Sequence, residues 1–133
     1  MPAKKILTGN QRKFLESHEL CSFAVSESDG MPHVTPVIYA MDGDCPVVAT
    51  DYGTKKLKIL KENKKVALLV EESRPNKVVM IQGECEIYER GKEYLRLLKI
   101  LMKKFKVYRE NPWGEGESPI LRITPRKAVS WGT

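Results

Sequence analysis

Short runs of strand-forming residues, separated by turn residues, dominate the pattern of the chain. In residues 84–88 polar and apolar positions alternate, which is the period-two pattern of a half-buried strand, whereas residues 66–72 begin with an uninterrupted apolar run. Asp-Gly and Ser-Asp-Gly sequences provide turn chemistry between the runs. The pattern predicts strands over residues 20–27, 33–41, 46–50, 66–72, 77–89 and 120–131. Gly83 is expected to mark a β-bulge in its strand.

Apolar positions spaced three or four apart predict a few helices among these strands. The clearest covers residues 91–107, and shorter helices are expected over residues 11–17 and 54–62. Consecutive strands with so few helices do not alternate as βαβ units do. The chain is therefore expected to be mainly β (α+β), with an antiparallel sheet or barrel and appended helices.

The composition of the chain allows it to form one hydrophobic core. It has 133 residues, of which 41% are hydrophobic and 30% charged, and it has no repeats or linkers, so we expect a single domain over residues 1–133. No apolar run reaches the roughly 18–20 residues of a membrane span. The N-terminus also lacks the features of a secretory signal, and these observations predict a soluble cytoplasmic protein.

The three cysteines, Cys21, Cys45 and Cys85, are far apart in sequence and form no C-x-x-C pair. Their number and spacing argue against a disulfide framework and against a thiolate metal site. Each lies within or beside a predicted strand, so we expect buried, unreactive side chains. A catalytic thiol would need a histidine partner, and the chain offers only His18 and His33.

The net charge of +6 suits an anionic partner such as nucleic acid, an acidic surface or a phosphorylated small molecule. Basic residues on the predicted helix 91–107 and in residues 61–65 suggest a nucleic-acid or anionic-surface binding module as one function. Aromatic residues make up only 8% of the chain and are not interleaved with basic residues on one strand face, as single-strand readers require. This module is kept as an alternative.

The start of the predicted helix 54–62 has the wrong charge for a helix N-terminus. Thr54 is a plausible N-cap, yet Lys55 and Lys56 follow it, where the helix dipole favours acidic residues. An anion bound there would meet free amides, the threonine hydroxyl and two ammonium groups, and Gly53 would let the backbone approach it closely. A solvated, lysine-rich surface helix is the alternative interpretation.

The order of the segments distinguishes these interpretations. A G-x-P strand start at residues 30–37 is followed by the turn at 42–43, a strand ending in threonine at 47–50, the Thr-Lys-Lys helix start at 54–56 and the basic strand entry at 64–69. This order resembles the flavin-binding split-barrel family typified by pyridoxamine 5′-phosphate oxidase. The likeness extends from about residue 15 to the end, through residues 81–88 and 121–131.

The resemblance implies an antiparallel split β-barrel with short flanking helices that binds FMN, usually at a homodimer interface. By position, Lys55 and Lys56 match the basic pair that holds the FMN phosphate, and Thr54 matches its hydroxyl neighbour. Thr50 and Asp51 match residues at the ribityl and phosphate end. The strand that edges the isoalloxazine ring is matched by His33, Val34, Thr35, Pro36 and Val37.

The tryptophans have two interpretations each. Trp113, in a Gly-rich loop, would either stack on the partner subunit's flavin or anchor its loop on the barrel, and Trp131 would lie in the core or at a dimer contact.

The sequence departs from the family pattern in two ways. The first basic residue is often arginine, which binds phosphate through two hydrogen bonds, whereas Lys55 offers a point charge. Pyridoxamine-phosphate oxidases proper also carry a longer C-terminal region that grips the substrate phosphate, so the vitamin B6 reaction is not expected here.

We therefore expect an FMN-dependent oxidoreductase or electron-transfer protein that acts on an unidentified small molecule or electron donor, with the redox chemistry supplied by the cofactor. Within the same family, deazaflavin or haem replaces FMN in some members, and His18 or His33 would have to ligate the haem iron. A structural dimer of the same fold that has lost its cofactor is a further alternative.

Overall fold

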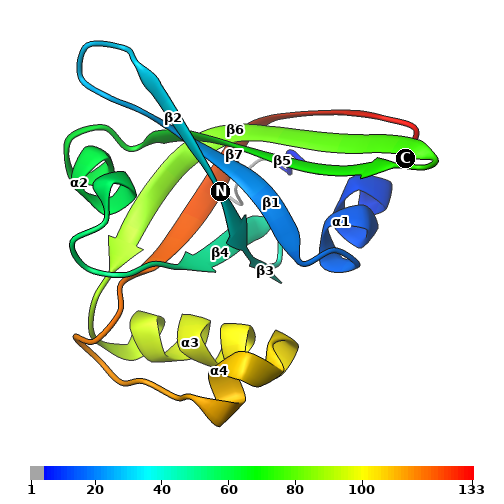
Figure 1. Ribbon diagram of the computed structural model, residues 1–133. Helices are drawn as coiled ribbons and strands as arrows, with labels where there is room; N and C mark the ends of the chain where they lie inside the picture. Colours follow the sequence, from blue (N-terminus) through cyan, green and yellow to red (C-terminus); the bar gives the residue numbers. More distant parts are fainter. Residues whose placement is uncertain (1–4) are drawn as a thin grey trace.

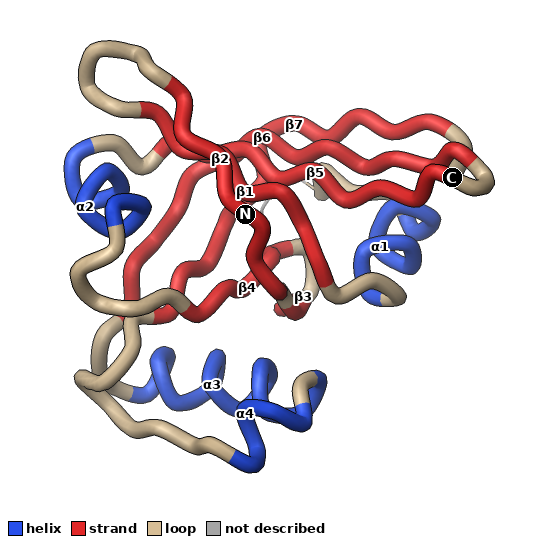
Figure 2. The backbone as a smooth tube through the Cα atoms, in the orientation of Figure 1, coloured by secondary structure: helices blue, strands red, loops and turns tan. Residues whose placement is uncertain are grey.

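The computed structural model describes residues 5–133, and its strands form one antiparallel sheet that curls into a half-barrel (Figures 1 and 2). The order in this seven-stranded sheet is β2-β1-β5-β6-β7-β4-β3. The strands are β1 (Leu20–Ser26), β2 (Pro32–Ile38), β3 (Ala40–Asp42), β4 (Cys45–Ala49), β5 (Lys65–Ser73), β6 (Asn76–Tyr88) and β7 (Ile120–Trp131). The helices are α1 (Gly9–Glu16), α2 (Lys55–Glu62), α3 (Lys92–Lys104) and α4 (Lys106–Glu110). The predicted mainly β, antiparallel split barrel with flanking helices is confirmed.

The predicted strand over residues 33–41 is wrong as a single element, because the chain breaks at Tyr39. β2 pairs with β1 at one edge of the sheet, whereas β3 pairs with β4 at the other edge. Tyr39 is completely buried, and its hydroxyl donates to Leu15 O at 2.5 Å. The chain therefore crosses between the two edges of the curled sheet at this residue, which ties the crossing to helix α1.

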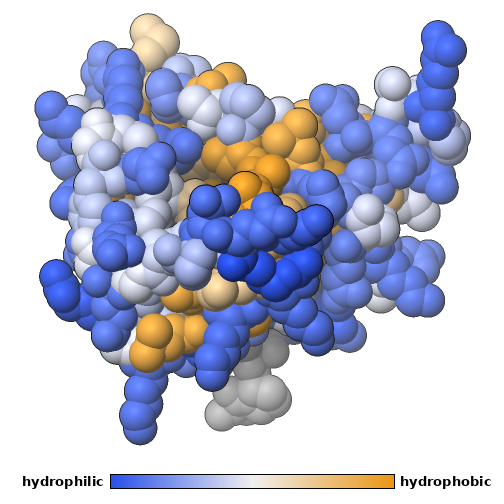
Figure 3. Space-filling model, turned by 60° about the horizontal axis from the view of Figure 1, so that its bottom comes forward, coloured by the Kyte–Doolittle hydropathy of each residue, from blue (hydrophilic) through white to orange (hydrophobic). Residues whose placement is uncertain are grey.

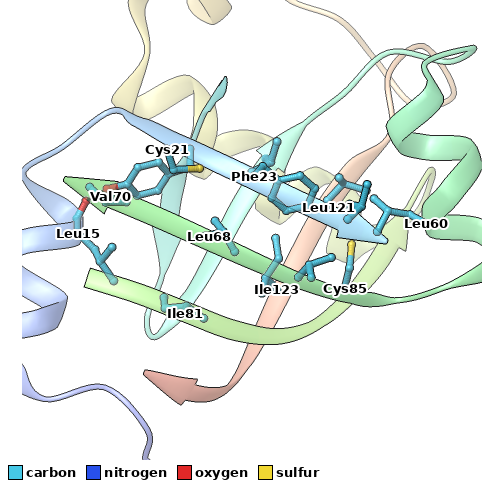
Figure 4. Close-up of a cluster of buried hydrophobic side chains, with 14 of the residues drawn as sticks. Leu15, Cys21, Phe23, Leu60, Leu68, Val70, Ile81, Cys85, Leu121 and Ile123 are labelled. Atoms are coloured by element: carbon cyan, nitrogen blue, oxygen red, sulfur yellow. Dashed lines mark hydrogen bonds between the residues drawn. The ribbon is translucent and has the colours of Figure 1, made fainter. Parts of the chain in front are cut away.

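One hydrophobic core fills the concave face of the half-barrel, and α1 and α2 close it from two sides (Figures 1 and 4). Figure 4 shows Leu15 of α1 and Leu60 of α2 pointing toward strand residues such as Phe23, Leu68 and Ile123. Cys21 and Cys85 lie in this cluster, and Cys45 is also buried. All three cysteines are free, so the expectation of small buried side chains is confirmed.

A second core lies between the outer side of β3 and β4 and the helices α3 and α4 (Figure 1). Here the predicted helix over residues 91–107 is interrupted at Phe105, whose backbone is extended (φ −113°, ψ 114°). Phe105 fits the helical spacing of apolar positions, but the chain turns at this residue while its side chain stays buried in the second core. Outside the core, the Asp42 carboxylate accepts hydrogen bonds from Nη1 and Nη2 of Arg96, each at 2.8 Å, and from Nε of Arg122 at 3.0 Å. These hydrogen bonds fix α3 to the sheet.

The expected bulge at Gly83 is confirmed. The β6–β7 register shifts between Gln82 and Gly83, so that Gln82 faces Lys127 whereas Gly83 faces Pro125. A Cβ atom added at Gly83 would lie 2.3 Å from Thr124 O. The two strands therefore approach each other so closely at this point that only glycine fits.

The surface is mostly hydrophilic, with apolar side chains gathered in patches on the face that Figure 3 shows. Trp131 is 51% exposed at the end of β7, so it does not lie in the core, and its place at a dimer contact stays a prediction. No helix in the described part of the chain is long and apolar enough to span a bilayer. The large apolar side chains that are exposed are Leu20, Met31, Val34, Tyr52, Leu95, Val107 and Trp131.

Candidate functional site: the β4–α2 connection and its two pockets

The connection between β4 and α2 places two threonine hydroxyls side by side. Thr50 follows the last residue of β4, Thr54 is the N-cap of α2, and their Oγ1 atoms are 3.4 Å apart. Thr54 Oγ1 accepts from Leu57 N at 3.3 Å and lies 3.0 Å from Asp51 O. Because this cap pairs the third amide of the helix, the amides of Lys55 and Lys56 are the free donors of the first turn.

The two lysines of this turn point to different sides of the helix. Lys55 is exposed, and its Nζ lies 3.7 Å from Glu27 Oε1 at the end of β1. Lys56 is half-buried, and burial lowers the pKa of its ammonium group although the nearby charge of Asp51 acts in the opposite direction. The charge of Lys56 also lowers the pKa of the Cys21 thiol, but burial raises that pKa by more. The two lysines are therefore not equivalent, because Lys55 has a carboxylate partner whereas Lys56 is partly buried near Asp51 and Cys21.

The donor set of this corner fits a phosphate group. The first turn of α2 contains no acidic residue, so nothing in that turn offsets the helix dipole. Gly53 has a φ of +83°, and a Cβ built there meets no atom within 4 Å, which leaves open space in front of the helix start. The Thr54 hydroxyl, two free amides and the Lys55 ammonium group thus border a space that an anion can enter, with the Thr50 hydroxyl 3.4 Å from that of Thr54.

That space belongs to a pocket of about 390 Å³ on the Lys55 side of the connection. It is lined by Glu27, Ser28, Gly53, Thr54, Lys55, Lys58, Ile59 and Glu62. The lining contains two carboxylates, those of Glu27 and Glu62, and Glu27 is the one that lies near Lys55. Of the expected phosphate-binding residues, the pocket contains Thr54 and Lys55, whereas Lys56 lies outside its lining.

The five expected ring-edging residues lie on β2, an edge strand of the sheet. His33, Thr35 and Val37 pair with Val25, Phe23 and Cys21, whose side chains belong to the concave core, so these three share that face. Val34 and Pro36 are exposed on the opposite face. Among the described residues, none from β2 lines either pocket beside the β4–α2 connection, so the structure does not bring the β2 set together with Thr54 and Lys55 in one cavity.

Thr35 carries an unusual polar atom. Its Oγ1 is buried and has no hydrogen-bond partner within residues 5–133. An unpaired buried hydroxyl costs about 1–3 kcal/mol, so a polar group of a bound molecule would be favoured beside it. Thr35 is therefore the β2 residue with the clearest reason to contact a ligand.

A larger pocket, of about 520 Å³, lies on the other side of the connection. Thr50, Asp51 and Trp113, three of the expected cofactor-binding residues, line it together. The sequence interpretation missed Tyr108 and Ser118, which come from α4 and from the loop before β7. The full lining is Ala49, Thr50, Asp51, Val107, Tyr108, Asn111, Trp113, Glu117 and Ser118.

Hydrogen bonds hold the loop that forms this second pocket. Trp113 Nε1 donates to Tyr94 Oη at 2.8 Å, and Tyr94 Oη donates to Ser118 O at 2.6 Å. Ser118 Oγ in turn donates to Thr50 O at 2.5 Å. Trp113 thus anchors its loop on α3, and the loop is tied to the end of β4 beside the Thr50–Thr54 pair.

The histidines show no metal-binding arrangement in the described part of the chain. His18 follows α1, and its Nε2 lies 2.5 Å from Glu72 Oε1 while its Nδ1 lies 2.7 Å from Phe14 O. Both ring nitrogens of His18 are therefore engaged. No group of three or more histidine, cysteine or acidic side chains within residues 5–133 could hold a metal ion.

Solved structures with the same fold differ in what they bind. This chain is similar to an FAD-binding protein from Mesorhizobium loti (20% identity over 93% of this chain and 94% of that chain, TM-score 0.74). It is also similar to HutZ, the haem storage protein from Vibrio cholerae (13% identity, 94% of each chain, TM-score 0.79). A protein related to general stress protein 26 from Clostridium acetobutylicum, of the pyridoxinephosphate oxidase family, has 17% identity over 92% of this chain and 85% of that chain (TM-score 0.75).

At these identities the structural likeness establishes the fold alone, and no curated protein matches the chain in sequence. The family model described as pyridoxamine 5′-phosphate oxidase matches residues 7–132, which is nearly the whole chain and includes the β4–α2 corner, β2 and the loop of Trp113. The chain belongs to the pyridoxamine 5′-phosphate oxidase family of split-barrel proteins.

Proposed function

We propose that this protein is an FMN-binding flavoprotein that works as an oxidoreductase or electron-transfer protein on a small molecule. The observation that carries the proposal is the start of α2, where the Thr50 and Thr54 hydroxyls lie 3.4 Å apart next to Lys55 and Lys56. A phosphate is the common biological group that such a set of amides, hydroxyls and ammonium groups recognises. FMN differs from riboflavin by this group alone.

The chain's own residues would have separate tasks in this site. Thr54 and the amides of the first turn would bind phosphate oxygens, and the half-buried Lys56 would supply a charge that water screens less than that of Lys55. Thr35, with its unpaired hydroxyl, would contact the ring system from β2. FMN, when bound, supplies the redox chemistry, while the protein supplies binding and orientation.

Titration of the purified protein with FMN, FAD and riboflavin, followed by flavin fluorescence and the visible spectrum, tests this proposal. We expect FMN to bind and riboflavin to bind at least about tenfold more weakly, because it lacks the phosphate. The double variant Lys55→Ala/Lys56→Ala should lose most of this preference. Lys61→Ala, in the last turn of the same helix, is the matched control and should keep it. Equal affinity for FMN and riboflavin would refute the proposed phosphate site.

Haem is the second candidate, because HutZ, which shares the fold, is a haem storage protein. Within this chain His33 is the histidine to test, since it is half-buried on β2 and both nitrogens of His18 are already engaged. Haem titration would then give a Soret band that shifts in His33→Ala and is unchanged in His18→Ala. A spectrum that is the same in both variants and in the parent protein argues against ligation by His33.

We further propose a homodimer, which the family resemblance implies. An almost continuous apolar row crosses the outer face of the sheet in exact register through Pro36, Leu69, Met80 and Val129, with only Ser22 interrupting it. Val34, 63% exposed, lies beside this row on β2. Sedimentation of the parent protein and of Leu69→Glu tests this proposal, since the charge should produce a monomer if the row is buried between subunits.

A further inference from the structure

We propose that the 520 Å³ pocket between the end of β4 and the loop before β7 binds a flat aromatic cation, at a site of its own beside the anion site. Its size lies within the roughly 300–1,000 Å³ of small-molecule sites. The proposal goes beyond flavin binding, because it concerns a second compound and, apart from Thr50, side chains to which the proposed function gives no task.

Two aromatic rings form one wall of this pocket. The rings of Tyr108 and Trp113 meet edge to face, with centroids 4.8 Å apart and planes at 88°. Trp113 is held by its hydrogen bond to Tyr94, and Tyr108 packs edge to face on Phe105 at 5.7 Å. A rigid aromatic wall of this kind favours flat ligands by stacking, and cations by their attraction to the ring faces.

The charge of the pocket is opposite to that of the whole chain. The net charge of the protein is +6, yet the lining contains Asp51 and Glu117 and neither lysine nor arginine. Glu117 is engaged, since its Oε2 accepts from Gly114 N at 2.8 Å. Asp51 is therefore the carboxylate that can pair with a ligand, and it is near enough to Tyr108 that its charge adds to the effect of burial in raising the pKa of that phenol.

The same charges explain why a phosphate does not fit here and why the two sites are compatible. An anion in this pocket would face two carboxylates and no ammonium group of the lining. Lys56 lies outside the lining of this pocket and interacts with the charge of Asp51. When a phosphate is bound at α2, Lys56 would pair with that phosphate instead. Occupation of the anion site should therefore leave Asp51 freer to bind a cation, and should not compete with it.

A charge series of one ring shape tests the proposal, using 1-methylnicotinamide, nicotinamide and nicotinate, which carry a positive, a zero and a negative charge. The chain has two tryptophans, so Trp131→Phe leaves Trp113 as the only tryptophan reporter. We expect saturable quenching by the cation, quenching by nicotinamide at about fivefold to tenfold higher concentration, and none that saturates with nicotinate. Equal responses to the three compounds would overturn the proposal.

Two variants in the same background locate the charge that is recognised. Asp51→Asn should weaken binding of the cation about threefold or more and leave nicotinamide unchanged. Glu71→Gln, which removes one negative charge from an exposed position on β5, is the matched control and should change neither. An Asp51→Asn protein that binds the cation as tightly as its parent contradicts the assignment.

The experiment contains no flavin, so its outcome does not depend on the proposed function. Repeating the titration with inorganic phosphate present tests whether the sites are separate. We expect unchanged or tighter binding of 1-methylnicotinamide, whereas competition between the two would show one shared site and refute the proposal.

Discussion

The hydroxyl oxygens of Thr50 and Thr54 lie 3.4 Å apart, although one residue follows a strand and the other caps a helix. This contact joins the sheet to α2 at the point where the helix is electrostatically most favourable to an anion. It also separates the two pockets of the site, because Thr50 lines one of them and Thr54 lines the other. Substitutions on either side of this contact should therefore have different effects.

Thr54→Ala should lower both the stability and the affinity for FMN. Loss of the N-cap hydrogen bond to Leu57 N is expected to cost about 1 kcal/mol of unfolding free energy. Thr54→Ser keeps the hydroxyl and should restore most of both quantities. Urea denaturation and FMN titration measure them, and an alanine variant with unchanged FMN affinity would remove Thr54 from the phosphate site.

Lys56→Ala should weaken FMN binding more than Lys55→Ala does. Lys56 is half-buried, whereas Lys55 is exposed and has Glu27 Oε1 at 3.7 Å from its Nζ. A hydrogen bond to a charged group contributes about 1.5–3 kcal/mol, so we expect a tenfold or greater rise in Kd for Lys56→Ala. Flavin fluorescence titration checks this order, and the reverse order would mean that the exposed Lys55, and not the half-buried Lys56, supplies the stronger contact to the phosphate.

Gly83→Ala should destabilise the sheet by about 1–3 kcal/mol, because the new methyl group would meet the backbone oxygen of Thr124 at 2.3 Å. Gly9→Ala is the same chemical change at the first residue of α1, where nothing lies within 4 Å, and it should be neutral or stabilising. Thermal unfolding of the two variants compares them directly. Similar melting temperatures would mean that β6 and β7 can separate at the bulge without cost.

Asp42 should contribute to acid sensitivity. Hydrogen bonds from Arg96, and then from Arg122, outweigh burial and hold the pKa of Asp42 below its ordinary value of about 3.9. This stabilisation is present above the pKa of the unfolded chain and is lost as the pH falls through the folded value. Unfolding free energies measured from pH 6 down to pH 2 should therefore fall less steeply in Asp42→Asn than in the parent protein. Parallel curves would contradict this role.

The thiols should be unreactive in the folded protein. Burial raises the pKa of Cys21 and of Cys85 to about 12, and burial also raises that of Cys45. The thiolate is the reactive form, so a disulfide reagent at pH 8 should react slowly with the native protein and with all three cysteines after denaturation. Fast labelling of one native thiol would indicate that its part of the core opens readily.

The local part of the site could be predicted from the sequence, because it depends on neighbouring residues. Thr54, Lys55 and Lys56 are consecutive, and the N-cap with its unusual charges follows from their order. The second pocket could not be predicted, since Asp51 meets Tyr108 and Trp113 only after α4 and the following loop have packed beside β4. Trp113 was recognised from its loop, but nothing in the sequence pairs it with Tyr94.

The two wrong element boundaries have a common physical reason. Tyr39 and Phe105 are apolar residues in runs that continue the expected pattern, and both are buried. Burial of a side chain does not reveal whether the backbone goes straight on or turns at that residue. In the sequence, the uninterrupted apolar residues at positions 37–41 break the alternation of a half-buried strand, and this is the available signal of the crossing between sheet edges.

The pairing of β4 with β7 has a consequence for how the protein assembles. The hairpins β1–β2 and β5–β6 join neighbours in sequence, whereas Thr50 N meets Pro119 O at 3.0 Å only when distant parts of the chain come together. Such non-local contacts form late, because the chain between them must be ordered first. The larger pocket is complete only after this step, so a compound bound there would act as a clamp on the finished fold and slow the unfolding of the whole domain.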